Sequence, residues 1–333
     1  MAPSWLVCCV ARGSDPESHL IKAQDDLVFF DCLENEHELE SLSLAKQTCE
    51  PSGEITPVNG RTDCLTACTD AAMGELAEAA KVLKATREAW AAKVIELGKD
   101  ALAELQWADL PTAQRMLRAN IGDAKKAVEM FLQALEFRTR DHQLYSSCTC
   151  DVRCDMRIIG TDAQEHPVVY LCARSQTDPL RFLRDQFLLT LDQACRLSSL
   201  SVQKSDGRIY LVLDMHGLTA KLNTDTSVLK DLAERLATVF AERIFKIVLV
   251  DFSRAAQVGW MLVKPFLQPV TRGKFAFVGK AGAIDLAEKD FDSTTILRFK
   301  KSLEVNRDPQ SSPLERQETA RRTAVHAVPL GPP

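Results

Sequence analysis

The sequence lacks two features that would place it in a membrane or on a secretory route. None of its apolar runs approaches the roughly 18–20 residues that a membrane-spanning helix requires. The N-terminus, MAPSWLVCCVARG, has no basic flank before its short apolar run, so we expect no cleaved signal peptide. These absences predict a soluble, cytoplasmic protein.

An excess of positive charge is also missing. The chain has 41 Lys and Arg residues against 46 Asp and Glu residues, which gives a net charge of -5. A nucleic-acid-binding protein needs a basic surface to displace the counterions of phosphates, so we expect no nucleic-acid partner. Any contact with a membrane must come from a local basic patch.

Catalytic motifs are absent as well. The chain has no G-x-S-x-G, no H-E-x-x-H and no G-x-G-x-x-G after a strand. GKAG at Gly279 lacks the Ser or Thr of a nucleotide-binding loop. His216, in LDMHG, follows a predicted strand without an acid or nucleophile of a known motif, which favours a structural role. We expect neither an enzyme nor a cofactor.

The 11 cysteines have no dense, regular spacing and fit reduced thiols better than a disulfide framework. The run CTCDVRC places Cys148, Cys150 and Cys154 downstream of His142, and together they could bind zinc. Their spacing is not C-x2-C, and no second pair follows. The metal site is therefore a weak candidate beside an ordinary interdomain connector.

What the chain does contain is enough apolar sequence for a core, because 46% of its residues are hydrophobic. Residues 1–70 collect turn-forming residues and are predicted to be loosely structured, with LVFF at 27–30 as a patch that docks on the body. Residues 71–145 are rich in Ala, Leu, Glu and Lys, and predict a small helical module. In it Pro111 begins one helix and Asp123 caps another. The predicted buried face of the latter comprises Ala127, Met130, Phe131, Ala134, Leu135 and Phe137.

Residues 146–302 predict an α/β domain. The short apolar runs RIIG, PVVYLCA, RIYLVLD, KIVLVD and KFAFVG are typical of strands covered on both faces of a parallel or mixed sheet. Helices are predicted at 179–197, 226–243 and 253–267, so that strands and crossover helices alternate. Residues 303–333 are polar and contain proline, which predicts a disordered tail.

The helix at 253–267 is unusual because it is apolar or small on nearly every side. Between Ala255 and Leu267 only Gln257 and Lys264 are polar. A surface helix normally has an apolar stripe about 100° wide with charges opposite. More than one side of this helix must therefore contact something apolar.

Two segments resemble the CRAL-TRIO family of lipid-binding and lipid-transfer proteins. RMLRANIGDAKKAVEMFLQALEFR is similar to the helical N-terminal module of the family. The segments HPVVYL, RIYLVLDMHGL and AERIFKIVLVDFSRAAQVGWMLVKPFLQPVTRGKFAFVG resemble its lipid-binding domain. The resemblance implies a mixed, mostly parallel sheet that floors a cavity for one lipid, with residues 253–267 as the gate helix.

The resemblance also implies the residues of the site. The cavity and gate would comprise Tyr170, Leu211, Leu213, Leu249, Phe252, Val258, Met261, Leu262 and Phe266. Glu242 and Lys274 occupy headgroup positions of the branch that transfers phosphatidylinositol, whereas Ile209 and Leu211 replace hydroxyl side chains of that branch. A phosphoinositide, another phospholipid, a sterol and a tocopherol-like molecule all remain possible ligands. Independently of the resemblance, Lys264, Arg272 and Lys274 form a local basic set at the end of the gate. Lys264 and Arg272 would face the membrane, and the alternative is a routine set of solvated basic residues.

The function implied is the binding and inter-membrane transfer of a single hydrophobic lipid by a monomer that associates peripherally and transiently with membranes. Exchange at a membrane is expected because burying an acyl chain is worth on the order of 10 kcal/mol against water. The alternative is a non-catalytic adaptor that uses the same fold for protein or membrane contacts and has a vestigial cavity.

Overall fold

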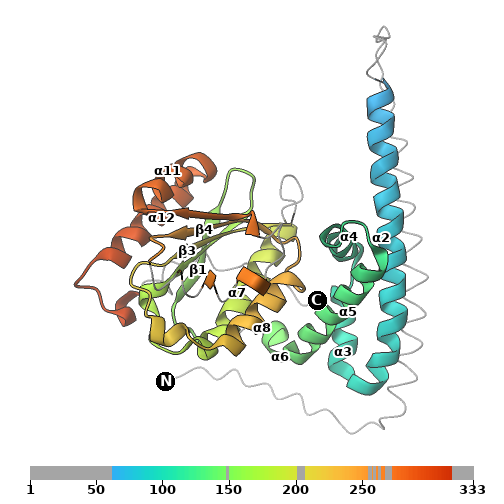
Figure 1. The fold of residues 1–333 in the computed structure, drawn as a ribbon, viewed down its shortest axis with the longest axis horizontal. Helices are drawn as coiled ribbons and strands as arrows, with labels where there is room; N and C mark the ends of the chain where they lie inside the picture. The colour runs from blue at the N-terminus through green and yellow to red at the C-terminus, as the bar shows by residue number, and fades with distance from the viewer. Residues whose placement is uncertain are drawn as a thin grey trace, which may run out of the picture.

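The computed structural model describes residues 62–147, 150–200, 207–253, 257, 260–261, 264–266 and 272–316. Its elements form a group of N-terminal helices and an α/β body, which lie beside each other (Figure 1). The predictions for residues 1–61, including LVFF, lie outside the described residues. In the described part, no helix is long and apolar enough to cross a membrane.

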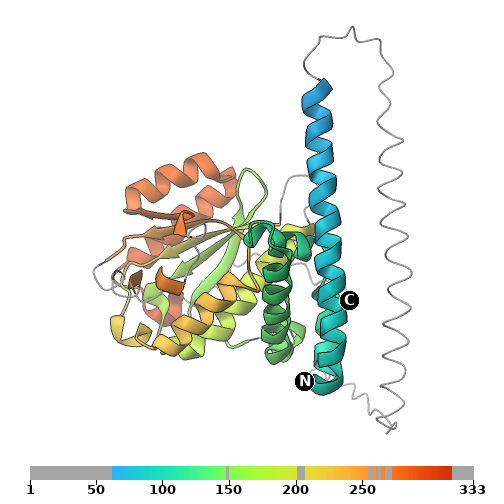
Figure 2. The same ribbon diagram turned by 45° about the vertical axis from the view of Figure 1, so that its right-hand side comes forward.

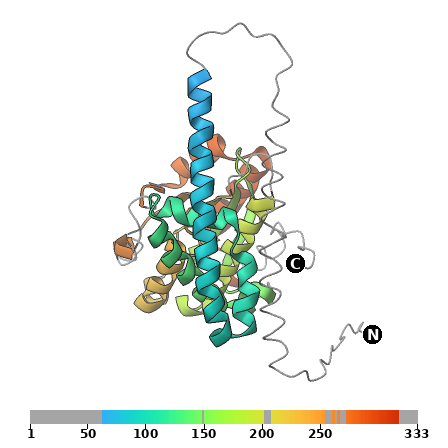
Figure 3. The same ribbon diagram turned by 90° about the vertical axis from the view of Figure 1, so that its right-hand side faces the viewer.

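The N-terminal group consists of helices only. They are α2 (Thr62–Leu97), α3 (Lys99–Glu104), the 3-10 turn η1 (Leu105–Trp107), α4 (Leu110–Ala119), α5 (Ala124–Arg140) and α6 (His142–Ser147). α2 begins before residue 71, so the helical module starts earlier than predicted. The N-terminal part of α2 projects beyond the other helices (Figures 2 and 3).

Local sequence explains where these helices begin. The side chain of Asp123 accepts a hydrogen bond from the Lys126 N–H, which confirms the predicted cap of α5. Asp109 caps α4 in the same way, and Pro111 lies in its first turn. The predicted apolar face of α5 is buried except for Met130, which is half-buried.

The body contains a five-stranded sheet with strands in the order β1-β2-β3-β4-β5. The strands are β1 (Asp155–Thr161), β2 (Pro167–Cys172), β3 (Ile209–Asp214), β4 (Ile244–Val250) and β5 (Phe275–Val278). β1 is antiparallel to β2, and the other neighbours are parallel. The mixed, mostly parallel sheet that the sequence predicted is therefore present.

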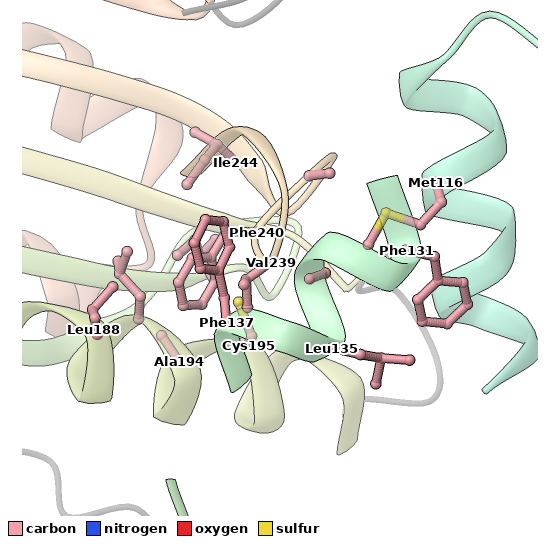
Figure 4. Close-up of a cluster of buried hydrophobic side chains, with 14 of the residues drawn as sticks. Met116, Phe131, Leu135, Phe137, Leu188, Ala194, Cys195, Val239, Phe240 and Ile244 are labelled. Carbon is pink, nitrogen blue, oxygen red and sulfur yellow. The ribbon is translucent and has the colours of Figure 1, made fainter. Parts of the chain in front are cut away.

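Helices cover both faces of the sheet (Figure 1). They are α7 (Leu180–Leu200), α8 (Thr226–Ala237), α11 (Lys280–Asp290) and α12 (Ser293–Arg307), with 3-10 turns η2 (Ala173–Ser175), η3 (Ala220–Asn223) and η4 (Lys264–Phe266). Alternating side chains divide the core: Leu211 joins the cluster under α7, whereas Tyr210 and Val212 join the cluster under α11 and α12. The α7 cluster continues into the N-terminal helices, where Phe131 and Met116 belong to it (Figure 4).

The prediction of a disordered tail from residue 303 is wrong for residues 303–316. α12 continues to Arg307 and buries Phe299, Leu303 and Asn306. Arg316 is only 2% exposed, and its guanidinium donates to the Asp308 carbonyl oxygen at 2.8 Å. The buried residues of α12 include polar ones such as Ser302 and Asn306, so the composition of this stretch resembles that of a disordered tail. Residues 317–333 lie outside the described residues.

Candidate functional site

A cavity of about 240 Å³ lies between the sheet and helices α7 and α8. Its lining is almost entirely apolar: Cys154, Met156, Leu171, Cys172, Ala173, Gln176, Leu180, Leu183, Phe187, Leu211, Leu213, Met215, Leu218, Asn223, Leu229, Leu232, Ala233, Leu236, Ile247, Leu249, Phe252, Trp260 and Phe275. Except for Cys172, at the end of β2, the strand residues come from one face of the sheet, as the two-residue period of a strand requires.

The helices that cover this cavity present side chains at helical spacing. α7 contributes Leu180, Leu183 and Phe187, which recur every three or four residues. α8 contributes Leu229, Leu232, Ala233 and Leu236 in the same way. The sequence predicted both helices but did not assign them to the site, although this periodicity was available as a signal.

The two polar residues of the lining bond to protein groups. The Asn223 amide donates to the Gln176 side-chain oxygen at 3.0 Å and to the Thr219 carbonyl oxygen at 3.0 Å. The Gln176 amide in turn donates to the Asp178 carbonyl oxygen at 2.9 Å. Since these groups are already paired, a ligand gains most from the aliphatic and aromatic walls.

The two thiols of the lining are uncharged. Burial raises the pKa of Cys154 far above its usual value, and the charge of Asp155 raises it further. Burial raises the pKa of Cys172 to about 12. The lining residues therefore bring no charge to the cavity at neutral pH.

Aromatic rings gather at the β5 side of the cavity. The Trp260 ring lies 4.5 Å from the Phe275 ring and 5.4 Å from the Phe277 ring, between centroids. Phe252 packs against Phe277 at 4.7 Å. We call these four residues the aromatic wall; Phe277, which is 45% exposed, carries it to the surface.

Several predicted cavity residues lie at this site. Leu211, Leu213, Leu249 and Phe252 all contribute to the lining. Met261 is 64% exposed. Val258, Leu262 and the side chain of Phe266 lie outside the described residues, as does most of the segment predicted to be the gate helix.

The placement of Tyr170 needs correction. Its hydroxyl donates to an Asp214 carboxylate oxygen at 2.9 Å, and its ring packs against Phe299 of α12. Tyr170 pairs with Val212, one residue along from Leu211, so both point to the other face of the sheet. Tyr170 therefore does not line the cavity.

The predicted headgroup residues form an ion pair of their own. The Lys274 ammonium lies 3.5 Å from a Glu242 carboxylate oxygen, and both side chains are partly buried. Glu242 has φ 56°, a left-handed conformation in the turn before β4. Neither residue is among those that line the cavity. Of the predicted basic pair, Lys264 is exposed and Arg272 is half-buried.

The cysteines considered as metal ligands have other environments. Cys148 lies outside the described residues, and burial raises the pKa of Cys150. The Cys154 thiol donates to the Gln186 side-chain oxygen at 3.8 Å and faces the cavity. In the part of the chain that the structure describes, no group of three or more His, Cys, Asp or Glu side chains could hold a metal.

Arg115 of α4 is a polar residue that the sequence did not single out. Its side chain is buried, its guanidinium donates to the Thr112 hydroxyl at 2.8 Å, and within the described residues its Nε atom has no hydrogen-bond partner. Burial, together with the nearby charge of Arg243, lowers the pKa of Arg115 to about 9. Arg243 follows Glu242 directly in the chain.

An open-ended apolar cavity under a mostly parallel sheet is the arrangement expected of a lipid-binding α/β domain. Residues 156–297 match the family model of the CRAL/TRIO domain. The matched segment runs from β1 to the first turn of α12. CRAL/TRIO domains bind and transfer lipids, and lipid binding in general is the function that the domain supports.

Comparison with solved structures adds a distant likeness. In all, 33 chains match, among them the one titled "Crystal structure of Sfh5". That match has a TM-score of 0.41 and 17% sequence identity, and covers 51% of this chain and 65% of the other. A search of curated proteins found no match.

Proposed function

We propose that the protein binds one hydrophobic lipid in the cavity and transfers it between membranes without changing it chemically. The observation that carries this proposal is the uncharged lining, in which the two polar side chains are already paired. Each methylene buried there contributes about 0.8 kcal/mol, so a bound chain would leave for water very slowly. Release is fast only where the ligand passes directly into a bilayer.

The size of the cavity favours a compact ligand. Small-molecule sites commonly measure about 300–1,000 Å³, and this cavity measures about 240 Å³. A single acyl chain or a compact ring system with a short tail suits it better than the two chains of a phospholipid. A sterol, a tocopherol-like molecule or a fatty-acyl lipid is accordingly the ligand class we favour.

The test of the proposal is a transfer assay between donor and acceptor vesicles. The full chain should accelerate the movement of a fluorescent sterol or fatty acid in proportion to its concentration. The transfer rate is compared between vesicles of neutral lipid alone and vesicles that also contain anionic lipid. If Lys264 and Arg272 face the membrane, anionic lipid should speed transfer, because each basic residue near an anionic surface contributes about 1 kcal/mol of binding free energy. Failure to accelerate transfer of either ligand would contradict the proposal and favour an adaptor.

Glu242 and Lys274 remain the predicted headgroup residues. Lys274 can offer a charged donor to an anionic group in place of its ion pair with Glu242. Any capture of phosphoinositides by the parent should fall several-fold in Lys274→Ala, whereas capture of a sterol, which needs no charged donor, should be unchanged. Lys81→Ala, at an exposed position of α2, is the matched control. Unchanged phosphoinositide capture in Lys274→Ala would remove Lys274 from this role.

A further inference from the structure

Among the described residues, the sheet has an open edge at β5. This strand lies at the end of the strand order and pairs there only with β4. The Ile247 N–H donates to the Lys274 carbonyl oxygen and the Asp251 N–H to the Val278 carbonyl oxygen, each at 2.9 Å. The backbone N–H and C=O groups of a strand point to its two sides in alternate residues. Those of Phe275 and Phe277 therefore point away from β4. In the described residues, these groups have no hydrogen-bond partner on that side.

The opposite edge, at β1, is protected. The Thr161 N–H donates to the Thr295 hydroxyl at 3.0 Å, and Arg298 donates to the Ile159 carbonyl oxygen at 3.0 Å. The β1 ladder also has an irregularity between Ile158 and Gly160, which is a common device for ending strand pairing. α12 therefore bonds backbone groups at the β1 edge, whereas the outward backbone groups of β5 have no such partner in the part of the chain that the structure describes.

The chemistry of the β5 edge restricts what can pair with it. Its four residues, FAFV, are apolar, and basic residues lie at both ends: Lys274, which pairs with Glu242, before the strand and Lys280 shortly after it. Lys280 is exposed, and its ammonium makes no ion pair within the described part of the chain. An extended segment of similar length, apolar in the middle and acidic at both ends, is complementary to this edge.

The chain itself contains such a segment outside the described residues. Residues 25–31 read DDLVFFD: four β-prone apolar residues with Asp25 and Asp26 before them and Asp31 after them. About 30 residues connect Asp31 to the start of α2, and a connection of that length can span up to roughly 100 Å. Reach is therefore no obstacle to pairing with β5.

We propose that residues 27–30 add to the open edge of β5 as a further strand. Main-chain hydrogen bonds to Phe275 and Phe277 supply the pairing, and the flanking carboxylates meet the basic residues at the ends of the strand. Alternate side chains of the added strand extend the aromatic wall beside Trp260, and the others lie on the α11 side. The segment is then part of the body of the protein and not a free extension.

Amide hydrogen exchange of the full chain tests this pairing at the two open amides. In the parent protein the Phe275 and Phe277 amides should exchange at least tenfold more slowly than in Phe29→Pro, because proline removes a ladder donor and breaks pairing. Ile55→Pro changes a residue of the same N-terminal region outside the segment. In this control the Phe275 and Phe277 amides should exchange as slowly as in the parent protein. Equal exchange in the parent and Phe29→Pro would overturn the proposal.

A charge exchange tests the ends of the strand. Lys280→Glu should weaken the protection of the Phe275 and Phe277 amides. A second change in the Lys280→Glu chain should restore this protection: either Asp31→Lys or the pair Asp25→Lys and Asp26→Lys. Restoration by Asp31→Lys indicates a parallel added strand, and restoration by the other pair indicates an antiparallel one. If neither restores protection, the charge complementarity is wrong.

A second copy of the chain is the competing occupant of the edge. Two β5 edges could pair in a dimer, which would protect the same amides. In that case protection would persist in Phe29→Pro, fall on dilution and accompany a dimer in light scattering. That combination would overturn the proposal, whereas protection that is independent of concentration and lost in Phe29→Pro supports it.

Discussion

The two faces of the sheet are covered in different ways. Under α7 and α8 the side chains are mainly aliphatic, and they leave the cavity between them. Under α11 and α12, Tyr210 packs against Phe291 at 4.9 Å, Tyr170 against Phe299 at 6.2 Å, and Phe291 against Phe299 at 5.8 Å, between ring centroids. One face therefore leaves room for a ligand, and the rings fill the other.

Charge is distributed in the same unequal way. On the α12 face, buried Asp214 accepts from the Tyr170 hydroxyl and the Asn306 amide, and the two terminal guanidinium nitrogens of Arg307 donate to its carboxylate. Arg307 also bonds Asp251, at the end of β4. The cavity lining has no such network. Directional bonds fix the shape of one face, and non-directional apolar contacts leave the other able to accept different ligands.

The largest expected effect comes from breaking the network. Asp214→Ala leaves Arg307 without its buried carboxylate and the Tyr170 and Asn306 donors without their acceptor. We expect the free energy of unfolding to fall by about 3–5 kcal/mol. Urea denaturation measures the loss, and a loss below about 1 kcal/mol would show that the network does not hold this face.

The polar face should also respond to pH through Asp155 of β1. Burial raises the pKa of Asp155 to about 6, and this effect exceeds the opposing effect of Arg157. The folded protein therefore holds this proton more tightly than the unfolded chain does. The resulting stability is fully present below about pH 4 and is lost as the pH rises through about 6, a difference of about 3 kcal/mol. Asp155→Asn should remove this dependence in denaturation curves recorded from pH 4 to 7; an unchanged slope would assign it to other groups.

A matched pair of alanines compares the two faces directly. Ala233 lines the cavity and Ala287 packs in the α11 cluster, and each is only 1% exposed. Ala233→Leu should change stability by less than about 1 kcal/mol, because the cavity receives the added carbons, and should reduce fatty-acid uptake. Ala287→Leu should lower the free energy of unfolding by about 1–3 kcal/mol through overpacking. It should leave fatty-acid uptake by the folded protein unchanged. Equal costs at both sites would contradict the difference in packing.

Much of the fold was predictable because local signals agreed with the global arrangement. Asp123 is a helix cap by its own chemistry, and the apolar runs that form β2, β3 and β4 are typical of covered strands. The cavity was predictable only through the resemblance to a family. Four of the residues it implied, Leu211, Leu213, Leu249 and Phe252, lie in the lining.

The rest depended on information that local sequence does not contain. Tyr170 is a plausible cavity residue by type, but the register between β2 and β3 turns it to the other face. Residues 303–316 have the composition of a tail, yet Leu303 and Asn306 are buried because α12 packs on the sheet, and Arg316 is buried against the end of α12. Tertiary contacts decided both cases, and only α7 and α8 offered an overlooked periodic signal.

The most direct test of the account is the lipid content of the protein itself. The full chain, purified from cells under non-denaturing conditions, is extracted and its lipids are quantified by mass spectrometry beside Ala233→Leu and Ala287→Leu. We predict close to one compact apolar lipid per chain in the parent and in Ala287→Leu, and much less in Ala233→Leu. Absence of any stoichiometric lipid from the parent, together with no uptake from vesicles, would contradict the claim that this face of the sheet is a lipid site.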